Sequence, residues 1–183
     1  MKAIILVAEK GRGKTTEAFD IVKQFSNKDL YVYDRQGQYK HFTNNKIKGL
    51  PSMEQFLQII KPVKNAVIIF EEATIFFSNK GREEIVIEKL VSNFHESNVI
   101  VFIFHSIRTI PIEIADQVDF MKVWHTNDRR TLIANKYKDD QDFLDLLLDV
   151  HDKTYGTEKN RETGEYADER SKNFYHYNRV YSR

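Results

Sequence analysis

Cysteine is absent from this 183-residue sequence. Disulfide bonds and thiolate metal sites are therefore excluded, and the composition fits the cytoplasmic location that we expect. Long hydrophobic runs are also missing. The longest, such as residues 99–104, are far shorter than the ~20 residues that cross a bilayer. Because an apolar segment begins almost at the first residue, we expect no signal peptide.

Neither sign of charge dominates the composition. The 28 basic and 27 acidic residues leave a net charge of +1, so no general attraction to nucleic acid or membranes is visible. The sequence also lacks an internal repeat, a GxSxG nucleophile motif and histidine pairs at metal-ligand spacing. Its length suits one α/β domain, predicted at residues 1–153, with a charged and aromatic tail at residues 154–183.

The clearest motif is a glycine-containing turn between a predicted strand and a predicted amphipathic helix. Residues 4–7 are all apolar, as expected for a strand buried on both faces. The turn matches GxxxxGK[ST], with Ala8 in place of the first glycine and with Lys14 and Thr15 at its end. We predict a phosphate-binding P-loop; the alternative is a β–α turn that binds nothing.

The residue types of this turn suit a bound triphosphate. Gly11 and Gly13 allow positive φ and a close approach of the backbone, and the helix N-terminus presents free N–H groups to an anion. Lys14 is expected to reach the β- and γ-phosphates of ATP, and the Thr15 hydroxyl to hold Mg²⁺. The predicted nucleotide-binding residues are Glu9, Lys10, Gly11, Arg12, Gly13, Lys14, Thr15 and Thr16.

A second apolar strand, residues 66–70, runs directly into two acidic residues. In a nucleotide site Glu71 would coordinate Mg²⁺, directly or through water, and Glu72 would orient and deprotonate the attacking water. Glu71 is one methylene longer than the aspartate usual at such a position. The alternative for the pair is an ordinary acidic surface.

Two further predicted strands end in polar side chains. Residues 99–104 run into His105, which we predict to sense the γ-phosphate; a structural histidine is the alternative. Residues 30–33 run into Asp34, which is either catalytic or the cap of a turn at Gly37.

The remaining pattern completes the predicted domain. Ser52 and Gln55 form a capping box before a helix, and residues 82–95 and 139–152 are predicted helices. Residues 75–82 are predicted as a loop. Residues 118–124 and 130–137 have period-2 features and are predicted to form a hairpin that finishes the sheet. Tail aromatics from residue 155 onward could stack on bases, pack on a neighbouring subunit, or do neither.

In combination these motifs resemble the HerA/FtsK branch of P-loop ATPases, which includes viral genome-packaging ATPases and zonular-occludens-toxin-like proteins. The resemblance covers residues 1–126 and rests on four stretches. These are Ala8-x4-Gly13-Lys14-Thr15, Tyr33-Asp34-x-x-Gly37-Gln38-Tyr39, Phe70-Glu71-Glu72-Ala73 and Phe104-His105-Ser106-x-Arg108-x-Ile110-Pro111.

The resemblance implies a RecA-like, mainly parallel sheet with helices on both faces, a homo-oligomeric ring, and Mg²⁺-dependent ATP hydrolysis that moves double-stranded DNA. It also implies an arginine that acts on the neighbouring subunit's nucleotide. The matching stretch carries Asn93-Phe94-His95 instead. The candidates are therefore Arg82, Arg108, Arg129 and Arg130, with Arg108 the first choice. The alternative function is an ATP-binding switch or assembly factor with little turnover; a small-molecule kinase is disfavoured because residues 75–81 offer no arginine-bearing lid.

Overall fold

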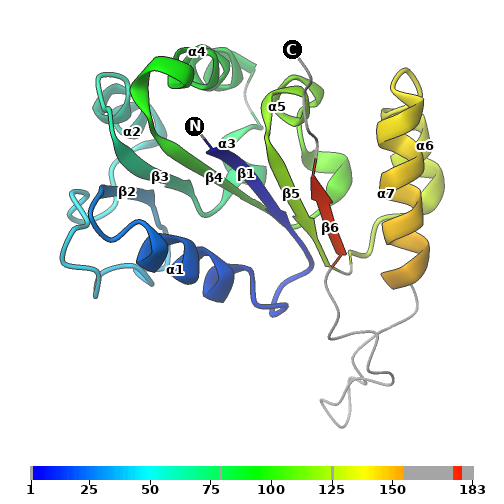
Figure 1. Ribbon diagram of the computed structural model, residues 1–183, viewed down its shortest axis with the longest axis horizontal. Helices are drawn as coiled ribbons and strands as arrows, with labels where there is room; N and C mark the ends of the chain where they lie inside the picture. The colour runs from blue at the N-terminus through cyan, green and yellow to red at the C-terminus, as the bar shows by residue number, and fades with distance from the viewer. Residues whose placement is uncertain (1, 79, 125, 155–174, 179–183) are drawn as a thin grey trace, which may run out of the picture.

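The computed structural model of the protein describes residues 2–78, 80–124, 126–154 and 175–178. Within these residues a six-stranded sheet has the order β2-β3-β4-β1-β5-β6 (Figure 1). The first five of these strands are parallel, and β6 is antiparallel to β5. The strands are β1 (Lys2–Val7), β2 (Asp29–Tyr33), β3 (Ala66–Phe70), β4 (Val99–Phe104), β5 (Phe120–Val123) and β6 (Tyr175–Asn178).

The inner strands form where the sequence is continuously apolar. Every residue of β3 and β4 is buried, as expected for parallel strands covered on both faces, and both have the predicted bounds. β4 lies between β1 and β3. The segments that follow these three strands therefore meet at one edge of the sheet, where α/β folds bind their ligands.

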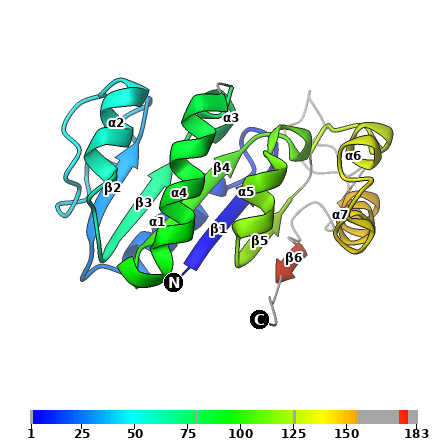
Figure 2. The same ribbon diagram turned by 90° about the horizontal axis from the view of Figure 1, so that it is seen from above.

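Helices cover both faces of the sheet (Figures 1 and 2). On one face α1 (Lys14–Gln24) packs through Ala18, Ile21 and Val22. The opposite face carries α2, α4 and α5, and α6 and α7 lie beyond β5 (Figure 2). The bounds are α2 (Met53–Ile60), α3 (Ala73–Phe76), α4 (Lys80–Glu96), α5 (Ile112–Gln117), α6 (Arg130–Lys136), α7 (Gln141–Thr154) and the 3₁₀ helix η1 (Ile107–Thr109). None of the described helices has the length and apolarity of a membrane span.

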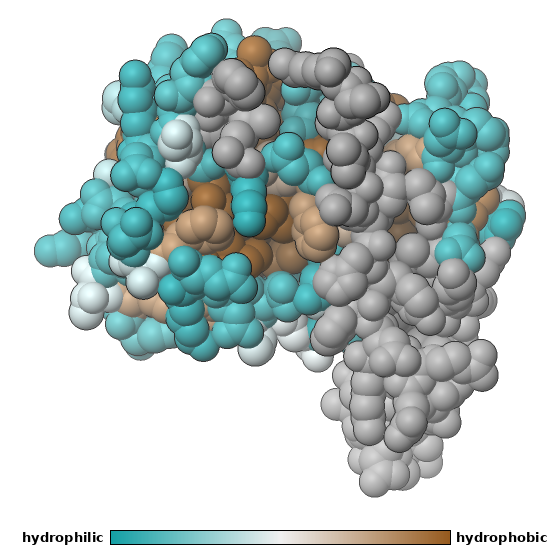
Figure 3. Space-filling view, viewed as in Figure 1, coloured by the Kyte–Doolittle hydropathy of each residue, from teal (hydrophilic) through white to brown (hydrophobic). Residues whose placement is uncertain are grey.

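The face that α1 covers is not closed along its whole width. A hollow of about 450 Å³ lies between α1 and strands β1 and β5, and its apolar lining includes Ile4, Ile21 and Phe120. Figure 3 shows apolar side chains gathered in the middle of this face, framed by hydrophilic ones.

An aromatic cluster beneath α2, α3 and α4 explains one error of the sequence prediction. The sequence predicts a loop at residues 75–82, but α3 ends at Phe76 and α4 begins at Lys80. The Phe76 ring is fully buried and meets the Phe70 ring edge-on, with centroids 4.8 Å apart. Phe70 in turn stacks on Phe102 at 5.0 Å. Burial of these rings holds the chain in a short helix where composition alone favours a loop.

The capping box before α2 is confirmed. The Ser52 hydroxyl accepts the backbone N–H of Gln55 at 3.1 Å, and the Gln55 side chain accepts the backbone N–H of Ser52 at 2.8 Å. These two bonds satisfy N–H groups that the first turn of a helix cannot pair internally.

The predicted C-terminal hairpin over residues 118–124 and 130–137 is wrong. β5 instead pairs in parallel with β1, with Ile4 opposite Phe120. Residues 130–136 form α6, whose buried Ile133 packs with Tyr137 one turn later. The i, i+4 spacing of these two apolar residues fits a helix, and its burial against α7 outweighs the weak period-2 pattern.

The end of the chain contributes a strand that the sequence does not predict. Most of the predicted tail lies outside the described residues, but Tyr175–Asn178 forms β6 and pairs with β5 in the register Phe120 to Asn178. The C-terminal helix predicted at residues 139–152 is confirmed as α7. Its buried Phe143, Leu144, Leu147 and Leu148 join the main core.

Candidate functional site

The turn between β1 and α1 has the backbone that its glycines allow. Gly11 and Gly13 have φ of 82° and 83°, in the left-handed region that strains other residues. No heavy atom lies within 4 Å of a Cβ built at either glycine, so the requirement is conformational rather than a matter of space. Ala8 is buried and is not among the described residues with positive φ. Alanine in place of the first glycine is therefore unstrained.

Lys14 lies across the inside of this turn. Its Nζ donates to the carbonyl oxygens of Ala8 at 2.7 Å and Glu9 at 2.8 Å, and the residue is 6% exposed. Burial lowers the pKa of Lys14 from 10.5 to about 8, although Glu71, Glu72 and Glu9 oppose the shift. The Lys14 ammonium group is thus held inside the turn, where a bound anion would offset the free-energy cost of its desolvation.

Thr15 and Glu71 meet at the start of α1. The Thr15 hydroxyl donates to Oε1 of Glu71 at 2.8 Å, and the Tyr39 hydroxyl donates to Oε2 at 2.6 Å. Glu71 is 6% exposed. Burial raises the pKa of Glu71, while the two hydroxyl donors lower it. The predicted metal-binding pair is therefore in direct contact, with a tyrosine on its other side.

Glu72 and His105 also lie together, at the ends of the neighbouring strands β3 and β4. Nε2 of His105 is 3.5 Å from Oε2 of Glu72, and the side chains are 38% and 15% exposed respectively. Gln36 contacts the other oxygen of Glu72, with Nε2 3.4 Å from Oε1. Burial and the charge of Lys14 lower the pKa of His105, against the opposing effect of Glu72. This shift favours the neutral imidazole.

Asp34 caps a turn, which is the structural alternative for this residue. Its Oδ1 accepts the backbone N–H of Gln36 at 3.0 Å, and its Oδ2 accepts that of Tyr39 at 2.8 Å. Gly37, at φ 68°, provides the left-handed residue that the turn needs. The turn thereby carries Gln36 to Glu72 and Tyr39 to Glu71.

The outer residues of the P-loop divide into two groups. Glu9 and Arg12 approach each other, with 3.7 Å between Oε2 and Nη2. Lys10 and Thr16 are exposed. The Asn127 side chain donates to Oε1 of Glu9 at 2.8 Å. The segment after β5 therefore borders the predicted nucleotide site.

The structure does not bring Arg108 to the other predicted catalytic residues. Its side chain is 57% exposed on η1, and its Nε lies 3.5 Å from Oδ1 of Asp128. Arg129 and Arg130 are exposed at the start of α6, and Arg82 belongs to α4. More than half of the Arg108 side chain is thus open to solvent, where another molecule can reach it.

Sequence reasoning misses three residues that organise the site: Tyr39, Gln36 and Asp128. The first two lie in the turn that the sequence does single out, between Asp34 and Tyr39. The sequence pattern places Asp128 only in a turn, yet it is 5% exposed and accepts the Ser106 hydroxyl at 2.5 Å and the Ile107 N–H at 2.6 Å. No sequence signal indicates this tie between the segments after β4 and β5.

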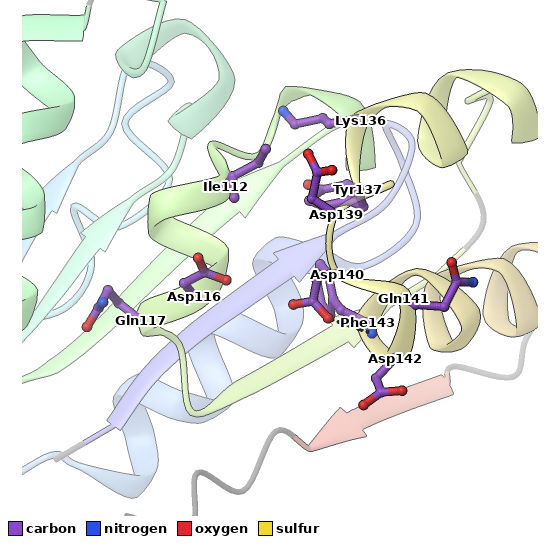
Figure 4. A pocket seen from close by; sticks show the side chains of 10 residues that line it. All are labelled: Ile112, Asp116, Gln117, Lys136, Tyr137, Asp139, Asp140, Gln141, Asp142 and Phe143. Carbon is purple, nitrogen blue, oxygen red and sulfur yellow. Dashed lines mark hydrogen bonds between the residues drawn. The ribbon is translucent and has the colours of Figure 1, made fainter.

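A separate cleft of about 790 Å³ lies between α5 and the turn that joins α6 to α7 (Figure 4). Asp116, Asp139, Asp140 and Asp142 line it, together with Lys136. None of these residues belongs to the predicted nucleotide site, so this cleft is distinct from the P-loop.

No protein-family model matches the chain, and no curated protein sequence matches it. Solved structures do. B204, the DNA-packaging ATPase from Sulfolobus turreted icosahedral virus, is 12% identical, with 98% of each chain covered and a TM-score of 0.61. The genome-packaging NTPase B204 from Sulfolobus turreted icosahedral virus 2, in complex with ATP-γS, is 15% identical over 84% of this chain and 88% of B204, with a TM-score of 0.60.

B204 from Sulfolobus turreted icosahedral virus 2 was also solved in complex with AMPPCP. That structure is 17% identical to this chain, covers 76% of this chain and 84% of B204, and has a TM-score of 0.59. At such identities the likeness establishes the fold. These structures come from the branch that the sequence motifs resemble. The chain accordingly has the RecA-like P-loop NTPase fold found in viral genome-packaging NTPases.

Proposed function

We propose that this protein is a Mg²⁺-dependent ATPase that drives nucleic-acid translocation, as in the packaging of viral DNA. The observation that carries the proposal is the 2.8 Å contact between the Thr15 hydroxyl and the Glu71 carboxylate. It joins the end of the P-loop to the first of the two acidic residues that follow β3, and these two parts of a P-loop NTPase site share the metal.

The donor atoms at this contact fit Mg²⁺. A hydroxyl and a carboxylate are hard oxygen ligands, and Mg²⁺ is commonly bound by one or two such groups together with water and substrate phosphates. Thr15 and Glu71 are the residues that would hold it. Bound there with ATP, the ion would neutralise charge on the β- and γ-phosphates.

Lys14 supplies the protein's own positive charge to the phosphates. In the described structure its ammonium group is held by the carbonyls of Ala8 and Glu9. A triphosphate along the turn would be a stronger partner for it, because hydrogen bonds between charged groups exceed those to neutral carbonyls. Backbone N–H groups of the turn and of the α1 N-terminus add to the same anion site. We assign the residues from Glu9 to Thr16 to nucleotide binding.

Glu72 is assigned the role of general base and His105 that of γ-phosphate sensor. Both follow buried strands that flank each other in the sheet, and their side chains are 3.5 Å apart. A water near Glu72 would lose its proton to the carboxylate as it attacks the γ-phosphate. An N–H of the His105 imidazole can donate to a phosphate oxygen or to that water, so it can link the state of the γ-phosphate to Glu72.

The catalytic arginine is assigned to a neighbouring subunit, with Arg108 the first choice, because its side chain is 57% exposed and contacts Asp128 rather than a residue of its own P-loop. This assignment requires a homo-oligomer, and we further propose that it is a ring that acts on double-stranded DNA in the cytoplasm, as the family resemblance implies. Two proteins with the same fold support the proposal. B204 from Sulfolobus turreted icosahedral virus is a DNA-packaging ATPase, and B204 from virus 2 is a genome-packaging NTPase that was solved in complex with ATP analogues.

One observation favours the alternative, an ATP-binding switch with little turnover. Both carboxylate oxygens of Glu72 are engaged, one near Gln36 and the other near His105. If those contacts persisted with nucleotide bound, they would make Glu72 a weaker base and hold its carboxylate away from the attacking water. ATP would then bind with little hydrolysis.

The deciding experiment measures ATP hydrolysis against protein concentration, with and without duplex DNA. A motor with a shared site should gain specific activity as concentration rises and again when DNA is added. A constant low rate alongside tight ATP binding would favour the switch. Absence of ATP binding with Mg²⁺ would contradict both.

A further inference from the structure

Tyr39 gives the two oxygens of Glu71 different surroundings. The phenol is fully buried and donates to Oε2 at 2.6 Å, whereas Oε1 faces the Thr15 hydroxyl at 2.8 Å. One oxygen is thus taken by a group inside the protein. The other lies at the P-loop, where the proposed function needs a metal ligand.

The position of Tyr39 is itself fixed from two directions. Its backbone N–H donates to Oδ2 of Asp34 at 2.8 Å, which closes the turn after β2. Its ring meets the Phe19 ring edge-on, with centroids 4.9 Å apart. Phe19 lies four residues after Thr15 in α1, which is one helical turn along the same face. Tyr39 therefore connects the turn after β2, the P-loop helix and the end of β3.

The length of the Glu71 side chain explains why a contact with Tyr39 would matter for metal binding. Glutamate has one more rotatable bond than aspartate, so an unsupported Glu71 could spread its carboxylate over several rotamers. The buried phenol selects one of them and aims Oε1 at Thr15. Removal of a group that holds a metal ligand in this way commonly lowers metal affinity by about 10- to 100-fold.

We propose that Tyr39 is a positioning residue of the metal site: it holds one oxygen of Glu71 so that the other is presented beside Thr15. This inference rests on the proposed function, since it concerns how the same site binds Mg²⁺. The inference assigns a role to Tyr39, a residue of the turn after β2. In the proposed function, Tyr39 contacts neither the phosphates nor the attacking water.

The test measures the affinity of the intact protein for AMPPCP in EDTA and in saturating Mg²⁺. The dissociation constant in EDTA divided by that in Mg²⁺ is the gain in nucleotide affinity that the metal provides, called the gain below. Tyr39→Phe keeps the ring against Phe19 and removes only the hydroxyl. It should leave the affinity in EDTA within about twofold of the original and reduce the gain about tenfold. An unchanged gain would overturn the inference.

Tyr137→Phe is the matched control, because Tyr137 is also buried and its hydroxyl donates to the carbonyls of Ile107 and Ile110, away from Glu71. It should leave the gain unchanged. Glu71→Gln should abolish the gain, and adding Tyr39→Phe to it should then have no further effect, since the two residues act as one unit. Independent, additive losses would contradict the proposed role.

Two results separate this inference from the proposed function. If the unmodified protein binds no AMPPCP, or binds it with no gain from Mg²⁺, the proposed function fails and the role of Tyr39 fails with it. If the gain is present and Tyr39→Phe retains it, only the role of Tyr39 is wrong. Asp34→Ala is a second variant that frees the Tyr39 backbone without touching the phenol; it should reduce the gain in the same direction.

Discussion

Nε2 of His105 lies 3.5 Å from Oε2 of Glu72, although 33 positions separate the two residues in the chain. The contact exists because β3 and β4 are neighbouring parallel strands, so the residues that follow them emerge side by side. It brings the proposed general base next to the proposed γ-phosphate sensor.

Glu72→Gln should leave ATP binding intact and reduce turnover by about 10²–10⁴-fold, because the amide cannot accept the proton of the attacking water. The change preserves size, so thermal stability should not alter. Single-turnover hydrolysis measured beside equilibrium binding checks this. Normal turnover in the variant would remove Glu72 from the role of base.

Lys14→Ala should weaken ATP binding strongly, since it removes the buried cation at the mouth of the loop. Lys23→Ala is the matched control: it lies on the same helix, its side chain is 67% exposed, and it pairs with Asp20. Titration calorimetry with ATP and Mg²⁺ compares the two. Equal affinities would show that Lys14 does not contact the nucleotide.

ATP affinity in EDTA should be level between about pH 7 and 8 and fall above that range, by about tenfold per pH unit. The reason is that burial lowers the pKa of Lys14 to about 8 in the free protein, so its charge is lost above that pH. Bound phosphates would keep Lys14 protonated. At a pH above about 8, ATP binding must therefore be accompanied by the uptake of a proton by Lys14. Calorimetry at about pH 8.5 in two buffers of different ionisation enthalpy measures this uptake. A flat affinity between about pH 7.5 and 9.5 would contradict it.

Arg108→Ala should leave nucleotide binding unchanged and reduce DNA-stimulated turnover by about 10³-fold or more. If Arg108 acts on a neighbouring subunit, mixing this variant with Lys14→Ala should restore part of the activity. The first variant then supplies an intact P-loop and the second an intact arginine. No recovery on mixing would count against a trans-acting Arg108, and the same mixing with variants of Arg82, Arg129 and Arg130 would identify another candidate.

Asp128→Ala should destabilise the protein by about 2–3 kcal/mol, because it leaves the Ser106 hydroxyl and the Ile107 N–H without their buried acceptor. Asp145→Ala is an exposed control on α7. Chemical denaturation compares their free energies of unfolding. A loss below about 0.5 kcal/mol for Asp128→Ala would mean that water replaces the carboxylate.

Much of the sheet is predictable because its signals are local. β3 and β4 are continuous apolar runs followed at once by polar residues, and the P-loop is a contiguous pattern. Those features alone are enough to place Lys14, Thr15, Glu71, Glu72 and His105 at one edge of a parallel sheet. The hairpin prediction fails because the alternation near Leu132 is weak, whereas Ile133 and Tyr137 have helical spacing and are buried.

The sequence by itself determined the inner strands, the glycine-containing turn of the P-loop and the acids that follow β3, since each depends on residues adjacent in the chain. Only the tertiary structure decided that Tyr39 meets Glu71, 32 positions away, that Asp128 meets Ser106, 22 positions away, and that Arg108 pairs with Asp128. Those contacts depend on the order of the strands and on the paths of the connecting loops, which no local pattern of residues specifies.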